Sequence, residues 1–191
     1  KIEGQGCGGI VEGSGFVVSP GLVATNAHVV AGIKTPYVFD SSGTHTAVAI
    51  WFDPNLDFAV LKVDGLSDSP LTFNTDNIAH GTPGVVLGYP GGGDFTAKPA
   101  AVLDEFTATG RNIYNQGVTN RDVYEIRADI IPGNSGCPLV IKDASVIGVV
   151  FAQSTTYNHV GYALSANEVV SEISQAKAHN QAVSTGSCAA E

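Results

Sequence analysis

The sequence Pro132-Gly133-Asn134-Ser135-Gly136-Cys137-Pro138 lies between two apolar segments that are typical of β-strands. The break between them predicts a tight turn that carries a serine, and both glycines of this turn can adopt positive φ at no steric cost. Such a turn would lift the Ser135 hydroxyl out of a sheet. It would also aim the backbone N–H groups of Gly133 and Ser135 into one small space, which is the arrangement of a nucleophile next to an oxyanion hole.

This segment alone does not distinguish a catalytic turn from an ordinary loop, because Pro, Gly, Asn and Ser are the commonest turn residues. Catalysis by serine needs a general base and an acid that orients the base. His28 follows an apolar run, and Asp57 directly precedes the apolar run 58–63. Each residue has a structural alternative, His28 as a hydrogen-bonded core histidine and Asp57 as the cap of a strand.

The order of these residues along the chain is histidine, aspartate, serine, as in chymotrypsin and unlike subtilisin or the α/β-hydrolases. Three segments carry a wider resemblance: GSGFVVSPGLVATNAHVV at 13–30, DPNLDFAVLKV at 53–63 and ADIIPGNSGCPL at 128–139. Together they resemble the trypsin-like serine proteases of the bacterial HtrA-like branch. The two terminal cysteines and the GYPGGG loop at 88–93 indicate closest similarity to the membrane-anchored acid-resistance proteases of mycobacteria and their kin.

The resemblance implies an all-β, chymotrypsin-like fold of two six-stranded antiparallel barrels with a C-terminal helix. Residues 1–78 would form the first barrel and carry His28 and Asp57, and residues 79–191 would form the second and carry Ser135. Short apolar runs with frequent polar, Pro or Gly breaks support this class independently. We expect two strands within 10–33 and further strands at 37–51 (with a hairpin tip at 41–43), 58–63, 85–89, 97–109, 123–131, 138–141, 146–153 and 162–164.

The ends of the chain give three further expectations. Residues 1–9 are rich in glycine and predict an extended arm. A helix is expected over about 166–179, because Val169, Ile173 and Ala176 lie on one face. Ser165 and Glu168 have the spacing of a capping box at the start of this helix.

The resemblance assigns the chemistry of a serine endopeptidase. His28 would act as the base, Asp57 would orient it, Ser135 would attack, and the N–H groups of Gly133 and Ser135 would form the oxyanion hole. Asp53 is the rival acid, and we prefer Asp57 because it directly precedes the apolar run, as in the family. The substrate would pair with the strand after the nucleophile, and its pocket would be lined by Ile130, Val149, Val150, Phe151, Tyr162 and Ala163.

Three residues near Ser135 bear on substrate specificity, on activation and on the space around the nucleophile. Asp129 lies six residues before Ser135, where trypsins carry their specificity aspartate, but HtrA-like sequences have a similar pair without trypsin specificity. Specificity therefore stays open, and we favour apolar residues at the cleavage site. Asn134 replaces the aspartate that pairs with a freed N-terminus in digestive proteases, so that activation is not expected. Cys137 stands where the family has glycine; we expect a buried inert thiol, and a redox-active thiol is the alternative. If the side chain blocks the site, the chain would instead be a protease-fold binding module.

Composition limits the partners. The 191 residues are 43% hydrophobic and 14% charged, which fits a globular protein with a proper core. The net charge of −9 and only 9 Lys and Arg residues argue against nucleic acid as a partner. The remaining histidines have no metal-ligand spacing, so no cofactor is expected. Protein or peptide is the expected substrate.

The cysteines and the ends of the chain bear on its location. We predict a disulfide between Cys7 and Cys188, which implies an oxidising compartment; three free thiols in a cytosolic protein are the alternative. No apolar run approaches the length of a membrane span. There is no methionine, so Lys1 is not expected to be a translation start. The resemblance implies a periplasmic or other extracytoplasmic domain whose membrane anchor lies upstream of this chain.

Overall fold

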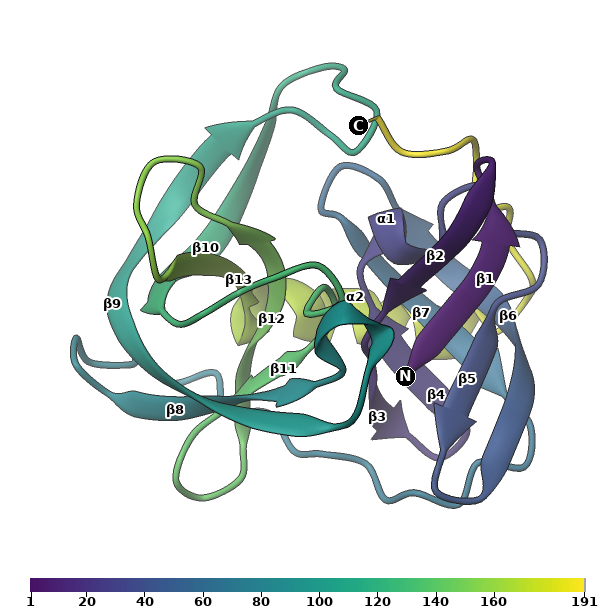
Figure 1. Cartoon of the computed structure of the whole chain (residues 1–191), viewed down its shortest axis with the longest axis horizontal. Coiled ribbons are helices and arrows are strands. Elements are labelled where there is room, and N and C mark those ends of the chain that lie inside the picture. The colour runs from purple at the N-terminus through teal and green to yellow at the C-terminus, as the bar shows by residue number, and fades with distance from the viewer. Residues whose placement is uncertain (191) are drawn as a thin grey trace.

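The computed structural model describes residues 1–190 and consists mainly of antiparallel strands in two adjacent units (Figure 1). The predicted two-barrel, chymotrypsin-like architecture with a C-terminal helix is confirmed. The expected strands are all present, with some differences at their ends. Those of the first unit are β1 (Ile2–Gly6), β2 (Gly9–Gly13), β3 (Phe16–Ser19), β4 (Leu22–Thr25), β5 (Tyr37–Asp40), β6 (Gly43–Asp53) and β7 (Phe58–Val63).

The first unit is a seven-stranded sheet in the order β2-β1-β5-β6-β7-β4-β3, one strand more than the barrel expected from the sequence. The extra pairing comes from residues 1–9, which are not a free arm. Here β1 forms a hairpin with β2 and also pairs with β5. Ile2 is buried, and a Cβ at Gly4 would come within 2.5 Å of the Ile33 side chain, so the glycine lets this strand lie flat on the core.

The second unit is a closed six-stranded barrel, as predicted, in the order β10-β13-β12-β11-β8-β9. The first and second units are joined by residues 64–82, which contain the predicted domain boundary between residues 78 and 79; that boundary stays a prediction. A short 3-10 helix, η1 (Pro90–Gly92), follows the first strand of the barrel. The barrel strands are β8 (Pro83–Gly88), β9 (Thr96–Gly110), β10 (Thr119–Arg127), β11 (Pro138–Val140), β12 (Val146–Gln153) and β13 (Val160–Ser165).

The C-terminal helix α2 (Ala166–His179) has the predicted bounds and contacts strands of both units. Its buried residues are Ala166, Val169, Ile173 and Ala176, so the predicted apolar face is the packed one. The predicted capping box is wrong. The Ser165 hydroxyl makes no cap hydrogen bond, and the Glu168 carboxylate accepts the Asp122 N–H of a neighbouring strand instead.

The largest core lies where the two units meet. It joins Phe16 and Phe58 of the first unit to Val149 and Leu164 of the second, with the buried face of α2 closing it. Hydrophobic burial is non-directional, so this shared core fixes the two units together without specifying side-chain geometry. The geometry of the candidate site therefore depends on the polar contacts described in the next subsection.

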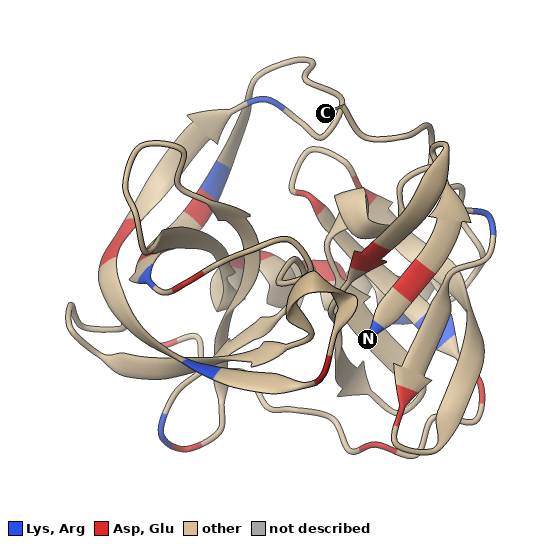
Figure 2. Ribbon diagram, viewed as in Figure 1, with Lys and Arg blue, Asp and Glu red and all other residues tan. Residues whose placement is uncertain are grey.

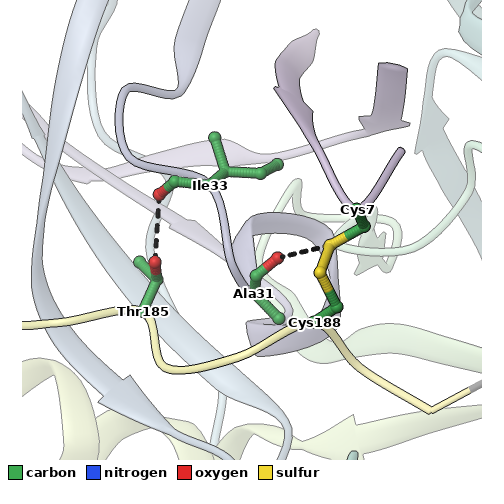
Figure 3. The surroundings of a disulfide bond; sticks show 5 residues. All are labelled: Cys7, Ala31, Ile33, Thr185 and Cys188. Atoms are coloured by element: carbon green, nitrogen blue, oxygen red, sulfur yellow. Dashed lines mark hydrogen bonds between the residues drawn. A yellow bond between two sulfur atoms is a disulfide. The ribbon is translucent and has the colours of Figure 1, made fainter. Parts of the chain in front are cut away.

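The predicted disulfide between Cys7 and Cys188 is confirmed (Figure 3). It attaches the C-terminal tail to the first unit, where the Thr185 hydroxyl also donates to the Ile33 carbonyl. The remaining cysteine, Cys137, is buried and free. Among residues 1–190, no helix is both long enough and apolar enough to cross a membrane.

Candidate active site

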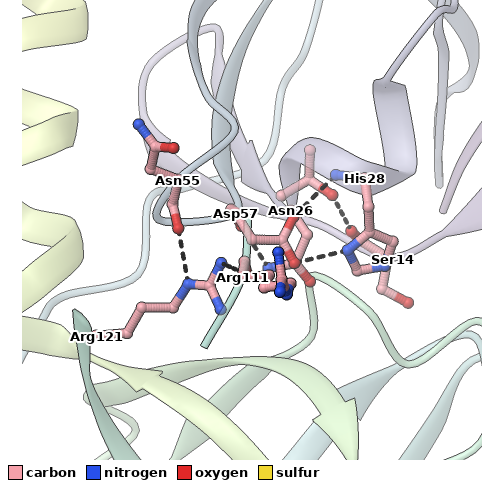
Figure 4. A network of polar contacts seen from close by, with 8 residues as sticks. Ser14, Asn26, His28, Asn55, Asp57, Arg111 and Arg121 are labelled. Atoms are coloured by element: carbon pink, nitrogen blue, oxygen red, sulfur yellow. Dashed lines mark hydrogen bonds and ion pairs between the residues drawn. The ribbon is translucent and has the colours of Figure 1, made fainter. Parts of the chain in front are cut away.

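The predicted base and acid lie in contact. His28 is in the short helix α1 (Ala27–Val30), which the sequence did not predict, and Asp57 is in the turn before β7 with a positive φ of 65°. His28 Nδ1 lies 2.7 Å from Asp57 Oδ2, and the His28 backbone N–H donates to Asp57 Oδ1 at 2.9 Å (Figure 4). The Asn26 side chain donates to the Asp57 carbonyl at 2.9 Å. These contacts orient the imidazole so that its Nε2 is free for another partner.

Asp53, the rival candidate for the orienting acid, has a different role. Asp53 Oδ1 accepts the N–H groups of Asn55 and Leu56, at 2.7 and 3.1 Å. This side-chain turn shapes the loop that delivers Asp57, a common use of aspartate in loops. The geometry therefore agrees with the choice of Asp57 over Asp53.

Electrostatics of the pair favour protonated histidine. Burial by itself would lower the pKa of His28, but the charge of Asp57 and its hydrogen bond outweigh this and raise the pKa above its ordinary value. The Asp57 residue is only 5% exposed, so solvent screens the pair weakly. The environment is suited to stabilising an imidazolium.

The nucleophile turn has the predicted positive-φ glycines, with φ of 91° at Gly133 and 84° at Gly136. Close packing makes both glycines necessary as well. A Cβ at Gly133 would come within 2.5 Å of the Gly91 nitrogen, and one at Gly136 within 2.0 Å of the Ser14 carbonyl oxygen. The turn is closed by Asn134, whose side chain accepts the Ile131 N–H at 3.0 Å and which is almost fully buried.

Two backbone donors of this turn are unused. Within residues 1–190, the N–H groups of Gly133 and Ser135 donate to no acceptor. The Pro132 carbonyl accepts the Gly91 N–H at 2.7 Å. Because N–H and C=O point in opposite directions across a trans peptide, this bond turns the Gly133 N–H away from η1. Both donors are thus available for an anionic oxygen.

Ser14 connects the parts of the site, a role that no motif in the sequence indicates. Its N–H donates to the Ser135 carbonyl and its hydroxyl donates to the Gly133 carbonyl, both at 2.8 Å. The same hydroxyl accepts the Tyr89 N–H at 2.9 Å, and the Ser14 carbonyl accepts the Thr25 hydroxyl at 2.8 Å. The fully buried Ser14 thus links the nucleophile turn, the strand that leads to His28 and the loop that begins η1.

Ser135 and His28 come from these linked segments, but no hydrogen bond joins the Ser135 hydroxyl to His28 within the described residues. The backbones are nevertheless adjacent. A Cβ at Gly13 would touch both Val29, next to His28, and the Ser135 carbonyl, at 2.6 and 3.3 Å. Catalytic hydrogen bonds are often long without substrate and tighten in the Michaelis complex.

Cys137 fits without disturbing the turn. Its side chain is completely buried, and a Cβ at Gly88 would come within 2.0 Å of the sulfur. The space taken by the thiol is therefore the space that Gly88 leaves empty. Burial raises the pKa of this thiol, which keeps it protonated and weakly reactive.

The predicted substrate-pocket residues divide into two groups. Val149, Val150 and Ala163 are fully buried in the core, so only their backbones could meet a substrate. Ile130 is 9% exposed, whereas Phe151 and Tyr162 are half-buried. Asp129 is not in an enclosed pocket. Its side chain is 61% exposed and pairs with His159 at the surface.

A model of the trypsin-like peptidase domain family matches residues 13–149. The serine protease Rv3671c of Mycobacterium tuberculosis is 42% identical over 184 residues, covering 95% of this chain and 46% of that protein. A probable periplasmic serine endoprotease, DegP-like, of Chlamydia muridarum is 36% identical over 81% of this chain and 31% of its own length. The chain thus spans less than half the length of these curated relatives.

Among solved structures, the crystal structure of the active form of the M. tuberculosis Rv3671c protease has a TM-score of 0.96 and 40% identity, covering 99% of this chain and 84% of that one. The inactive form of the same protease has a TM-score of 0.81 and 39% identity, covering 91% and 87%. The backbone of this chain is therefore more similar to the active form.

Proposed function

This chain belongs to the trypsin-like peptidase family, and from that premise we propose that it is a serine endopeptidase using His28, Asp57 and Ser135. The observation that carries the proposal is the pairing of Asp57 with both the ring and the backbone N–H of His28. The ring contact fixes the tautomer of His28, and the backbone contact holds the Asp57 carboxylate in place for it, which a merely structural histidine would not need. Nor would it need to lie beside a turn with two unused N–H donors.

The proposed mechanism assigns one step to each group. His28 Nε2 takes the proton of the Ser135 hydroxyl as the oxygen attacks the scissile carbonyl, and later gives that proton to the leaving amine. Asp57 stabilises the imidazolium formed between these steps. The N–H groups of Gly133 and Ser135 bind the oxyanion of the tetrahedral intermediate, a contribution of about 3–4 kcal/mol for each donor.

We propose that the turn needs no activation by a freed N-terminus. In digestive proteases that step supplies a charge partner for an aspartate beside the nucleophile. Here Asn134 is uncharged, and its amide already accepts the Ile131 N–H and approaches the Cys137 sulfur at 3.7 Å. Neutral hydrogen bonds inside the turn replace the ion pair.

We propose that peptides bind in extended form along β12, with Ile130, Phe151 and Tyr162 supplying side-chain contacts and Val149, Val150 and Ala163 contributing backbone. The exposed Asp129, already paired with His159, supports a preference for apolar rather than basic residues at the cleavage site. Periplasmic relatives and the disulfide support an extracytoplasmic location. A part in stress or acid resistance, and a membrane anchor outside this chain, rest on the family resemblance.

The proposal is tested by covalent labelling with a fluorophosphonate probe. We expect the intact protein to be labelled, and the Ser135→Ala and His28→Ala variants to lose the label. The alternative function, a protease-fold binding module, predicts that the intact protein stays unlabelled while it still binds peptides. Cys137 supports the enzyme, because the thiol fits against Gly88 without displacing the nucleophile turn.

A further inference from the structure

A polar pocket of about 500 Å³ opens beside the catalytic pair. His28, Asp57, Arg111 and Arg121 all line it, and Figure 4 shows these four side chains near one another. The tip of the β9–β10 hairpin and the C-terminal tail complete the lining with Asn112, Ile113, Asn115, Ala189 and Ala190.

The charge of this pocket is unusual for the protein. Figure 2 shows how few Lys and Arg residues the chain has, and the sequence contains 9 of them against 18 Asp and Glu. Two of the three arginines nevertheless lie in one pocket. Among residues 1–190, Asp57 is the only carboxylate in the lining, and that carboxylate is already paired with His28.

The two arginines differ in how their donors are used. Arg121 Nε donates to the Asn55 carbonyl at 2.8 Å and its Nη2 to the Arg111 carbonyl at 3.0 Å. Its guanidinium also lies 5.8 Å from the centre of the Phe151 ring. The donors of Arg121 are thus used in hydrogen bonds that connect the loop at Asn55 to the hairpin tip at Arg111. Arg111 is exposed and, within the described part of the chain, its side chain makes one long hydrogen bond, to the Asn115 carbonyl at 3.3 Å.

The pocket walls are fixed from both sides. The Ile113 N–H donates to the Pro54 carbonyl at 3.1 Å, and the Ile113 carbonyl accepts the Ala190 N–H at 2.8 Å. The hairpin tip is therefore attached both to the loop that carries Asp57 and to the C-terminal tail. Such a preformed pocket lowers the entropy cost of binding a side chain.

The position of the pocket indicates which part of a substrate reaches it. Phe151 belongs to β12, the strand along which peptides are proposed to bind, and we infer that this strand holds the substrate segment on the N-terminal side of the scissile bond. Arg121, which lines the pocket together with His28, lies next to the Phe151 ring, so the pocket is near both β12 and His28. A side chain that leaves an extended substrate here, shortly before the cleavage site, would face Arg111. A guanidinium with free donors favours a carboxylate, which it can bind through two parallel hydrogen bonds.

We propose that Arg111 is a specificity residue that binds a Glu or Asp side chain of the substrate on the N-terminal side of the scissile residue. This inference rests on the proposed endopeptidase function. It names a class of sequence, an acidic residue followed closely by the cleavage site. It also assigns different roles to the two arginines. Arg121 holds the pocket residues in position, and Arg111 binds the substrate carboxylate.

The test uses fluorogenic peptides in pairs that differ only by Glu or Gln at one of the three positions before the scissile residue. We expect one Glu peptide to be cleaved with a kcat/KM about 10-fold above its Gln twin, mainly through KM, with the ratio falling as salt is added. Arg111→Gln should bring this ratio close to one. Because each ratio is taken within one enzyme, a general loss of activity cancels.

Lys142→Gln is the matched control, since it removes the same charge from an exposed residue outside the pocket and should keep the ratio. A wild-type ratio of one at all three positions, or an unchanged ratio in Arg111→Gln, overturns the inference while cleavage itself upholds the proposed function. Binding of the same peptides to Ser135→Ala, measured by fluorescence anisotropy, tests Arg111 without catalysis. Equal affinity for the twins in that assay also overturns it.

Discussion

Replacement of Ser14 by alanine tests whether the nucleophile turn is held from outside by one hydroxyl. The substitution keeps the Ser14 N–H bond to the Ser135 carbonyl. It removes the donor to the Gly133 carbonyl and the acceptor of the Tyr89 N–H, both in a buried environment. Ser14 is completely buried, so bulk solvent does not reach either of the two groups.

The magnitude follows from the two groups left without a partner. An unsatisfied buried donor or acceptor costs about 1–3 kcal/mol, so we expect Ser14→Ala, which leaves two such groups, to lower the free energy of unfolding by about 2–6 kcal/mol. The freed Gly133 carbonyl also loosens the peptide planes of the oxyanion hole. Loss of a whole donor costs about 3–4 kcal/mol of transition-state stabilisation. Loosening should cost less, about tenfold in kcat, with KM within about twofold.

Ser165→Ala is the matched control. Ser165 is also a completely buried serine, but its hydroxyl has no hydrogen-bond partner in the structure. Its removal should change stability by less than about 1 kcal/mol, because no bond is broken. Urea denaturation and steady-state kinetics on one peptide substrate give both quantities. Equal stability and equal kcat for the two variants would refute the role assigned to Ser14.

The remaining predictions concern protonation, the disulfide and the turn glycines. Activity should fall at low pH with a midpoint above about 6.5, because the active form of His28 is neutral and its pKa is raised; a rate–pH profile in which the midpoint lies below that value contradicts this. Replacing both Cys7 and Cys188 by serine should cost about 5 kcal/mol of unfolding free energy for a loop of 181 residues, and reductant should then have no further effect on the melting curve. Gly136→Ala should lower the free energy of unfolding by more than about 3 kcal/mol, because its Cβ would meet a carbonyl oxygen at 2.0 Å. Gly8→Ala is the control, because Gly8 has a similar φ but a Cβ there would meet nothing within 4 Å. It should cost only the backbone strain of about 1–2 kcal/mol, and thermal melts measure both.

Local sequence determined the elements that have clear ends. The strand β7 was predicted with its observed bounds because its apolar run starts after Asp57 and stops at Asp64. The hairpin of β1 and β2 was missed because its glycines give no period-two pattern. Those strands form through contact with Ile33 and pairing with β5, which are distant in sequence.

The site shows the same division. The roles of His28, Asp57 and Ser135 could be predicted from residue type and order, because their chemistry depends on side-chain identity. The role of Ser14 could not, because it depends on hydrogen bonds to Gly133 and Tyr89, which are separated from Ser14 by 119 and 75 residues. The pair of arginines was missed for a similar reason, since one lies in a hairpin tip and the other in a strand.

The distribution of charge in the site separates two functions that many proteases combine. The contacts that shape the nucleophile turn come from backbone groups, the Ser14 hydroxyl and the Asn134 carboxamide, none of which titrates near neutral pH. The charge-dependent contact among the proposed catalytic residues is the pair of His28 and Asp57. Acid should therefore switch off the base while it leaves the oxyanion hole intact, and the loss of activity should follow a single protonation and reverse fully. A turn built on an aspartate–amine ion pair would instead lose its shape whenever either partner changed charge.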